Sequence, residues 1–183
     1  MNSLAIAGII VGIFVLLVIF LFNSLIRLRN QVKNAFAQID VQLKRRNDLI
    51  PNLVESVKGY MKHERKLLEN ITRARSAILK AKTMADKAKS SNMLSETLKS
   101  LFAVSENYPK LKANENFLQL QEELSGTENK IAYARQNYND MVMTFNTKIE
   151  SFPNNILANM LGFKQETLFE ASEAEKKNVK VKF

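Results

Sequence analysis

The amino-acid sequence predicts an all-α protein, in which an N-terminal transmembrane helix continues into an antiparallel bundle of four main long helices. Three observations support this prediction: an unbroken apolar run at the N-terminus, long heptad patterns after it, and few helix-breaking residues. The 183 residues include only five glycines and three prolines. That is too few for the frequent turns of an all-β sandwich or the glycine loops of a βαβ fold.

The composition excludes several classes of function. The chain has no cysteine, which rules out disulfide scaffolds, thiol nucleophiles, iron–sulfur clusters and cysteine zinc sites. Its single histidine, His63, leaves no histidine pair for a metal ion and no second imidazole for a proton relay. We therefore expect no enzymatic activity, no catalytic residues, no cofactor and no metal.

The first feature along the chain is a run of nineteen apolar residues, 4–22. As a helix it spans about 28 Å, close to the thickness of a bilayer core. A cleaved signal peptide needs a basic segment before the run and a small-residue cleavage site after it. Only Met-Asn-Ser precedes this run, so residues 1–22 are predicted to be a permanent, single-pass anchor.

The residues that flank the span predict its orientation. Arg27, Arg29 and Lys33 follow it, and no lysine or arginine precedes it. The positive-inside rule then places the N-terminus outside and the rest of the chain in the cytoplasm. Within the span, Gly8 and Gly12 are candidates for close packing against a second membrane helix. The same spacing is common in spans that do not pair, so both interpretations stay open.

The bundle is predicted over residues 23–163. Its first helix continues from the span without a breaker. Heptad patterns extend from Leu53 to Ala81 and from Phe117 to Phe152, which is typical of helices packed side by side at shallow angles. A shorter helix is expected between them, over residues 93–107. A free-standing coiled coil is the alternative, but the short loops favour a closed bundle.

Local residues predict where these helices begin and end. The expected boundaries are a second helix starting around Asn47–Pro51, a third capped by Ser90-Ser91-Asn92 and ended by Tyr108-Pro109, a fourth ended by Phe152-Pro153, and a short fifth helix over 154–161 stopped by Gly162. The apolar side of this short helix is expected to close the bundle, with membrane or partner contact as the alternative. Residues 164–183 are predicted to be a mobile, charged tail.

Positive charge is concentrated in the first half of the bundle. Residues 23–89 contain 16 Lys+Arg and 6 Asp+Glu, whereas residues 90–183 contain 11 and 12. If the second helix returns to membrane level near residue 78, the basic side chains there contact the anionic leaflet. The lipid-contact candidates are Arg27, Arg29, Lys33, Lys80, Lys82, Lys87 and Lys89. A solvated helix face is the alternative explanation.

The charged residues have two other possible uses, nucleic-acid binding and the binding of a small anion. No zinc-finger spacing, helix-turn-helix glycine or stacking aromatic pattern accompanies the basic residues, so no nucleic-acid partner is expected. The segment 44–48 could bind phosphate or carboxylate through its arginines. A basic helix end followed by a capping aspartate is the simpler interpretation.

A buried polar cluster is predicted between the helices. Glu64 occupies a position in an otherwise apolar seam, and Glu128, Arg135 and Asn139 share one face of the fourth helix. Pairing Glu64 or Asp48 with Arg135 would compensate charges that are costly to bury alone. Such a cluster serves more often to fix helix register than to catalyse a reaction.

Two long motifs resemble a known family. Residues 34–64 read NAFAQIDVQLKRRNDLIPNLVESVKGYMKHE, and residues 108–117 read YPKLKANENF. These stretches, with matching positions over about residues 4–163, are similar to the LemA family of bacterial membrane proteins. Asn47 stands where many members have histidine. The resemblance implies a helical bundle with an N-terminal span in a bacterial inner or plasma membrane, and it implies no enzymatic activity.

These observations together predict a non-enzymatic, membrane-anchored scaffold on the cytoplasmic membrane face. We expect it to bind anionic lipid, to form homo-oligomers and to organise membrane or membrane complexes. The alternative is an adaptor or sensor that holds another, unidentified membrane protein of a signalling or proteolytic complex.

Overall fold

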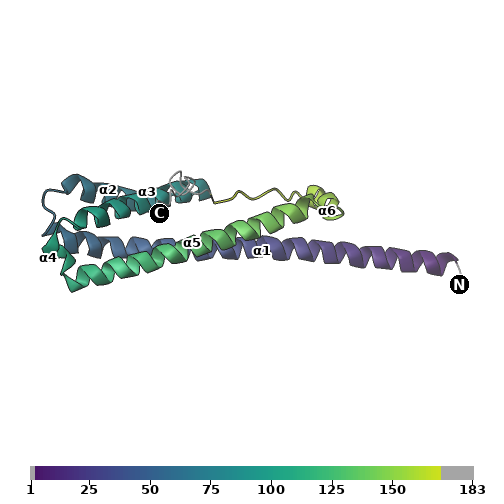
Figure 1. Cartoon of the computed structure of the whole chain (residues 1–183). Coiled ribbons are helices and arrows are strands. Elements are labelled where there is room, and N and C mark those ends of the chain that lie inside the picture. The colour runs from purple at the N-terminus through teal and green to yellow at the C-terminus, as the bar shows by residue number, and fades with distance from the viewer. Residues whose placement is uncertain (1–2, 170–183) are drawn as a thin grey trace, which may run out of the picture. The chain divides into compact units, whose positions relative to one another are not determined.

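The computed structural model describes residues 3–169, which form six α-helices and no β-strand (Figure 1). The helices are α1 (Ser3–Lys58), α2 (Arg65–Lys80), α3 (Met84–Ser105), α4 (Pro109–Lys112), α5 (Glu115–Glu150) and α6 (Asn154–Met160). The prediction of an all-α fold with a long apolar helix at the N-terminus is confirmed. Residues 1–2 and 170–183, which include most of the predicted tail, lie outside the described residues.

The chain divides into two compact units. Unit 1 contains residues 1–37 and 136–168, and unit 2 contains residues 38–135 and 169–183. Helices α1 and α5 are each divided between the units. The first part of α1 and the second part of α5 belong to unit 1, and their other parts belong to unit 2.

Unit 2 is an up-and-down arrangement of four helices. Contacts between Asp40 and Lys87 and between Arg46 and Ser91 show that α1 and α3 run in the same direction. Helix α5 runs the opposite way, because Arg46 contacts Glu128 whereas the later Tyr60 contacts the earlier Asn114. Helix α2 packs against α3 and also runs opposite to α1, to which a short turn joins it.

The core of unit 2 is apolar and is drawn from all of these helices. Its members share burial of more than nine-tenths of their surface, and they are Ile50, Leu53, Val57, Met61, Ile71, Ala74, Ile78, Leu94, Leu98, Leu101, Leu111, Phe117 and Leu124. Burying this many large side chains removes apolar surface from water, which is the main force that holds such a bundle together.

Helix α1 does not end near Pro51, contrary to the sequence prediction. It continues through Pro51 to Lys58. A proline inside a helix lacks the N–H that would bond the carbonyl four residues earlier. Here that carbonyl belongs to Asn47, and Arg75 of α2 donates its Nε–H to it at 3.1 Å. The hydrogen bond from a neighbouring helix therefore compensates for the one that proline removes.

The predicted second helix is divided in the structure. The heptad pattern from Leu53 to Ala81 covers the end of α1, a turn at residues 59–64 and all of α2. Met61 lies in this turn and is fully buried, so apolar spacing continues where the helix stops. Periodicity alone cannot detect such a break, because the turn residue packs into the same core.

Helix α3 begins earlier than predicted. Its N-cap is Thr83, whose Oγ1 accepts a hydrogen bond from the Asp86 N–H at 3.1 Å. The predicted cap residues Ser90 and Ser91 lie inside the helix and are buried. Serine favours caps because its hydroxyl bonds nearby backbone, but here Ser91 accepts hydrogen bonds from arginines instead.

The remaining boundaries follow the sequence closely. Helix α3 ends shortly before Tyr108-Pro109, and α5 ends just before Phe152-Pro153. Helix α6 is the predicted short helix, and Gly162 after it has a φ of 71°. Gly162 N–H bonds Asn159 O, and Phe163 N–H bonds Ala158 O. This pair of hydrogen bonds is a Schellman motif, which favours glycine at the left-handed position.

Unit 1 pairs the first part of α1 with the second part of α5. Its buried side chains recur at spacings of three, four and seven residues on both helices, namely Leu21, Leu25, Val32 and Ala35 on α1 and Tyr138, Val142, Phe145 and Ile149 on α5. The rings of Phe36 and Tyr138 lie 6.2 Å apart. Phe163 contacts both Arg29 and Phe145. The two helix parts are therefore antiparallel.

The segment after α6 returns along α5. Asn146 donates its side-chain N–H to Glu166 O at 2.9 Å and accepts from Glu166 N–H at 2.9 Å. Tyr138 O–H donates to Thr167 O, and Phe169 is buried. The predicted mobile tail from residue 164 is therefore wrong for residues 166–169. Their charge pattern gives no sign of these backbone hydrogen bonds.

Candidate functional site

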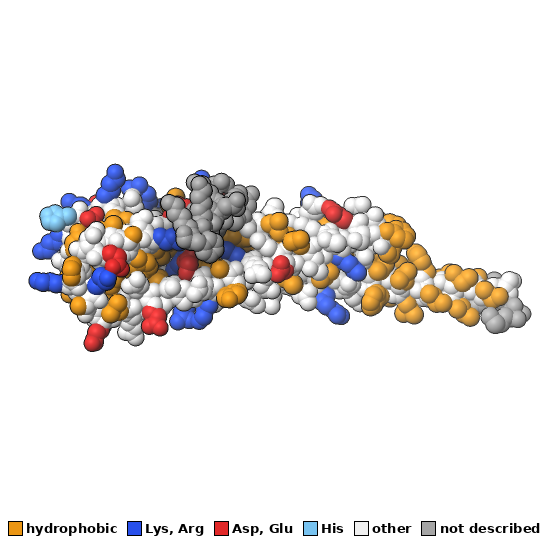
Figure 2. All heavy atoms as spheres, viewed as in Figure 1, with side chains coloured by type: hydrophobic (Ala, Val, Ile, Leu, Met, Phe, Trp, Pro, Cys, Tyr) orange, Lys and Arg blue, Asp and Glu red, His pale blue; other side chains and the backbone are white. Residues whose placement is uncertain are grey.

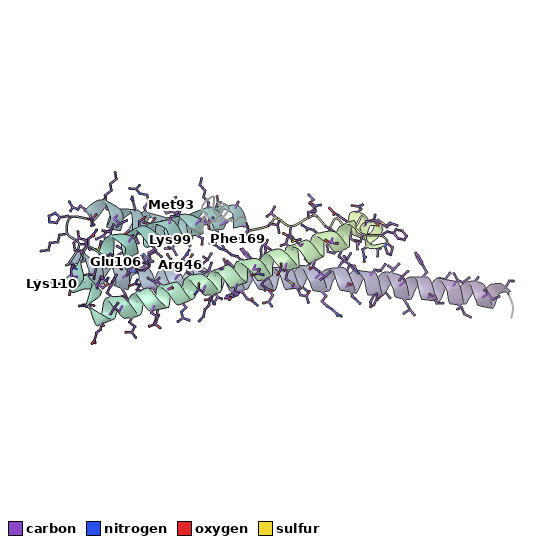
Figure 3. The ribbon with its side chains drawn as sticks, in the orientation of Figure 1. Arg46, Met93, Lys99, Glu106, Lys110 and Phe169 are labelled. Atoms are coloured by element: carbon purple, nitrogen blue, oxygen red, sulfur yellow. The ribbon has the colours of Figure 1, made fainter. Side chains whose placement is uncertain are left out.

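The most unusual side chain in unit 2 is Arg46 of α1 (Figure 3). Its side chain is fully buried, and it is the largest side chain buried to this extent. Ile39, Leu43, Arg46, Ile50, Leu53 and Val57 form the buried stripe of this part of α1. An arginine therefore occupies a seam position that heptad spacing would give to an apolar residue.

Hydrogen bonds from two helices compensate the buried guanidinium. Nη1 donates to Glu128 Oε2 of α5 at 2.6 Å and to Ser95 Oγ of α3 at 2.9 Å. Nη2 donates to Ser91 Oγ at 2.8 Å, and Ser91 O lies 3.3 Å away. Ser95 also contacts the second oxygen of Glu128. The planar donor set of arginine suits such simultaneous contacts, which a lysine ammonium would not reproduce.

A second arginine joins the same serine. Arg135 of α5 donates from Nη2 to Ser91 Oγ at 2.6 Å. Its guanidinium carbon lies 4.6 Å from the ring centre of Phe169, as a cation–π contact. Ser91 thus connects Arg46 and Arg135, so that α1, α3 and α5 meet at one polar cluster. We call Arg46, Ser91, Ser95, Glu128 and Arg135 the arginine cluster.

The structure places only part of the sequence-predicted cluster here. Glu128 and Arg135 belong to it, whereas Asp48 and Glu64 lie elsewhere. Asp48 is exposed and pairs with Lys44 one helical turn earlier. Glu64 accepts a hydrogen bond from Tyr108 O–H at 3.2 Å. Asn139 is half-buried on the part of α5 that belongs to unit 1.

The predicted pairing of Arg135 with Asp48 or Glu64 is wrong, because neither carboxylate lies on a helix face that points toward Arg135. Arg46 occupies the buried seam of α1, and Asp48, two residues further on, points away from it. Glu64 belongs to the turn rather than to a helix seam, since α2 begins at Arg65. Sequence analysis missed Arg46 as the central residue; its place in the buried spacing between Leu43 and Ile50 is the signal that could have identified it.

Glu64 and Tyr108 form a small polar contact of their own. Burial raises the pKa of the Tyr108 phenol above its ordinary value of 10.0, and the hydrogen bond and charge of Glu64 raise it further. In unit 1, burial likewise raises the pKa of Tyr138, with a second contribution from the charge of Glu166. Both phenols are therefore neutral at physiological pH and act as hydrogen-bond donors.

A small polar cavity opens beside the arginine cluster. It has a volume of about 110 Å³ and is lined by Asn92, Ser95, Glu96, Lys99, Glu128, Asn129, Ala132 and Arg135. Among residues 3–169 no group of three or more histidine, cysteine, aspartate or glutamate side chains is arranged to hold a metal ion. Both Nη atoms of Arg46 donate hydrogen bonds, whereas its buried Nε has no hydrogen-bond partner among the described residues.

A larger groove lies at the turn between α1 and α2. Its volume is about 910 Å³, and ten residues line it. The floor is apolar and covered, formed by Val54, Met61 and Leu68. The rim is exposed and charged, formed by Glu55, Lys58, Lys62, Arg65 and Glu69. Sequence analysis missed this groove because it exists only where the chain reverses direction.

The N-terminal part of α1 carries many exposed apolar side chains (Figure 2). Twelve large apolar residues between Ile6 and Phe22 are exposed, including Phe20 at 71%. Among the described residues, α1 is the one helix long and apolar enough to cross a membrane. Gly8 and Gly12 have open space where a side chain would lie. This surface is unsuited to water, since exposed patches of this size mark contact with lipid or protein.

The basic candidates separate into two groups. Arg27, Arg29 and Lys33 are exposed on α1 shortly after the apolar run. Lys80 is the last residue of α2, and Lys82 lies between α2 and α3; both are exposed. Lys87 and Lys89 belong to α3, where Lys87 pairs with Asp40 at 2.7 Å.

Comparison with known proteins agrees with these features. The sequence model of the LemA family matches residues 35–183. The chain belongs to the LemA family. Protein LemA of Metamycoplasma hominis is 32% identical over 172 residues, which are 92% of this chain and 78% of that relative. The family resemblance noted from the sequence is confirmed.

Two further relatives match a shorter stretch. Magnetosome proteins MamQ 1 and MamQ 2 of Paramagnetospirillum magneticum are each 34% identical over 74 residues. These residues cover 40% of this chain and 27% of each relative. The similarity is therefore confined to part of both proteins.

Proposed function

We propose that this LemA-family protein is a non-enzymatic scaffold anchored in a bacterial inner membrane, which self-associates and organises membrane or membrane complexes. The observation that carries the proposal is the exposed apolar surface of α1, which continues in one unbroken helix into structured units. A membrane span that is joined to a helical bundle through a continuous helix suits a protein that positions others. The magnetosome relatives, which are named for a membrane organelle, are consistent with this role.

The proposed topology is a single span with the N-terminus outside and the bundle in the cytoplasm. Arg27, Arg29 and Lys33 support it, because basic residues near a span favour the cytoplasmic side. These exposed cations are also the residues that we propose to contact anionic headgroups. Each is worth about 1 kcal/mol near an anionic leaflet.

The proposal that the protein is not an enzyme is supported by a structural role for the arginine cluster. Its one carboxylate, on Glu128, accepts hydrogen bonds from Arg46 and Ser95. A catalytic centre needs a reactive group with access to a substrate. The cluster instead joins α1, α3 and α5 through polar contacts.

Self-association is proposed to involve the span. Gly8 and Gly12 lie one helical turn apart on an exposed part of α1, with open space at both positions. Small residues at this spacing allow a second helix to approach closely in a membrane. Replacing both by leucine should therefore reduce the oligomer without disturbing the protein's own packing.

The experiment that tests the proposal is affinity purification of the full chain in mild detergent, followed by mass measurement of the complex. A scaffold should appear as a discrete homo-oligomer, and Gly8→Leu with Gly12→Leu should shift it to smaller species. Ala7→Leu is the matched control, because it adds comparable bulk on a neighbouring face of the same helix. A monomer with every variant contradicts self-association.

An adaptor for another membrane protein is the alternative, and the groove at the α1–α2 turn favours it. An apolar floor with a charged rim of both signs fits a short amphipathic segment of a partner. The same purification separates the two functions. An adaptor remains monomeric until a stoichiometric partner co-purifies, and Leu68→Glu in the groove should release that partner.

A further inference from the structure

Helix α6 in unit 1 presents its side chains in an unusual way. Its covered positions are small or polar, namely Asn154 and Ala158, which are 3% and 2% exposed. The large apolar residues face outward: Phe152, Ile156, Met160 and Leu161 are between 50% and 79% exposed. Ile156 and Met160 lie four residues apart in α6 and therefore share one face, whereas Phe152 and Leu161 flank the helix. We call these four residues the α6 apolar face.

The register of unit 1 sets the level of this face relative to the apolar run of α1. Phe36 of α1 packs against Tyr138 of α5, and Phe163 connects Arg29 with Phe145. Moving seven residues back along α1 thus corresponds to moving seven residues forward along α5. Continued by a further seven, the same register places Phe152 at the level of Phe22, where the apolar run ends.

The α6 apolar face is therefore continuous with the apolar part of α1 within the same unit, as the orange side chains over both elements in Figure 2 show. Basic residues surround it as well. Arg29 lies over the Phe163 ring at 5.8 Å, and Lys164 follows directly. Apolar side chains at this depth, with cations beside them, are the pattern of helices that lie in the membrane interface.

We propose that the α6 apolar face is a second membrane-contact site, which inserts into the lipid interface next to the span. The proposal rests on the membrane span of the proposed function and adds a second contact to it. Two contacts, one across the bilayer and one along its surface, would restrict how unit 1 tilts relative to the membrane. The tilt of a span is set by its packing and by its contacts with the membrane interface.

The chain has no tryptophan, so a single introduced tryptophan reports its own surroundings. Phe152→Trp and Met160→Trp place the reporter on the α6 apolar face, at positions 79% and 77% exposed, where the fold tolerates it. Tyr133→Trp is the matched control on α5 in unit 2, at 74% exposed. Ile13→Trp reports the middle of the span.

Each full-length variant is reconstituted in phosphatidylcholine vesicles and quenched by brominated lipid or by aqueous iodide. The proposal expects Phe152→Trp and Met160→Trp to show blue-shifted emission, protection from iodide and loss of emission with lipids brominated near the headgroup end of the chain. Ile13→Trp should respond most to bromines near the tail end. Tyr133→Trp should respond to iodide alone.

Three results would overturn the proposal, and they differ. If the two α6 reporters behave as Tyr133→Trp does while Ile13→Trp is quenched by brominated lipid, the span stands and the α6 contact is refuted. If the α6 reporters are shielded from iodide yet insensitive to brominated lipid, protein covers the face instead of lipid. If Ile13→Trp escapes brominated lipid, the span itself fails, and the second contact fails with it.

Discussion

Arg46 Nη1 lies 2.6 Å from Glu128 Oε2, and this contact joins α1 to α5 through two residues that are 82 positions apart in the sequence. The arginine is fully buried, while about a third of the glutamate side chain is exposed. The pair therefore sits at the boundary of the core, where the carboxylate keeps some hydration. Burying such a pair costs desolvation free energy. In return, a well-aligned pair adds specificity to the way the helices pack.

The first prediction concerns this pair. Arg46→Ala should lower the free energy of unfolding by about 2–4 kcal/mol, because it removes a large packed side chain and four hydrogen bonds. Arg46→Lys should recover only part of the lost stability, since one ammonium cannot donate well-aligned hydrogen bonds to Glu128 and Ser91 together. Thermal or denaturant unfolding of the full chain in detergent measures both.

Arg45→Ala is the matched control for Arg46. Arg45 is half-exposed, and its contact with Glu123 spans 4.0 Å, so its loss should change stability by about 1 kcal/mol or less. Equal effects of the two substitutions would show that Arg46 contributes no more than a surface cation.

The second prediction concerns the Tyr108 phenol. Partial burial and Glu64 both raise its pKa, so the folded protein holds this proton to higher pH than the unfolded chain does. The stability gained in this way is present below pH 10.0 and is lost as pH rises through the raised pKa. Glu64→Gln should lower the pKa of Tyr108 but not return it fully to its ordinary value, because burial remains.

Ultraviolet absorbance of tyrosinate measures that shift. Tyr108→Phe identifies the contribution of this residue among the four tyrosines of the chain. A pKa of Tyr108 that is unchanged in Glu64→Gln would mean that the hydrogen bond at 3.2 Å is absent in solution.

The third prediction concerns the core of unit 1. Phe145 is 1% exposed, and Phe145→Asp should destabilise the protein by several kcal/mol, against a total of about 5–15. The exposed Tyr133 offers the comparison, since Tyr133→Asp on the same helix should have little effect. The change in melting temperature of each variant tests the assignment of the buried stripe of α5.

The fourth prediction concerns Asn146 and the segment that follows α6. Asn146→Leu removes both hydrogen bonds to Glu166, at a cost of about 1–3 kcal/mol. Hydrogen exchange should become faster at the Glu166 amide. Gln136→Leu, at an exposed position on the same helix, should leave that amide unchanged. Unaltered exchange in Asn146→Leu would contradict the two-bond contact.

The fifth prediction concerns orientation. The chain has no cysteine, so single cysteines can be labelled selectively in spheroplasts with a membrane-impermeant maleimide. Ser3→Cys should react from outside, because Ser3 adjoins the apolar run on the side that the proposed topology places outside, whereas Tyr133→Cys should react only after lysis. Labelling of Tyr133→Cys in intact spheroplasts would reverse the proposed topology.

Much of the fold was predictable because its signals are local. Nineteen consecutive apolar residues describe a span without any knowledge of their neighbours, and Phe152-Pro153 ends a helix through its own backbone. The boundaries that were wrong depend on contacts with distant residues. Pro51 stays inside α1 because Arg75 donates a hydrogen bond to the Asn47 carbonyl. Ser91 stays inside α3 because two arginines donate hydrogen bonds to its hydroxyl.

The candidate site was predictable only in part, for the same reason. Glu128 and Arg135 were recognised from their shared helix face, since spacing along one helix is a property of the sequence. Their partners were not, because the position of Arg46 opposite them depends on the register between α1 and α5. A shift by one residue would turn that side chain away from the core.

The sequence by itself determined the helical class, the apolar N-terminal helix, the family and the last helix boundaries, because each follows from composition, periodicity or backbone chemistry within a few residues. The tertiary structure decided where α1 and α2 separate, which charge is buried, and where the α6 apolar face lies relative to the span. These features depend on which side chains meet across helices far apart in the chain. Packing and compensated hydrogen bonds decide that, and local propensity does not.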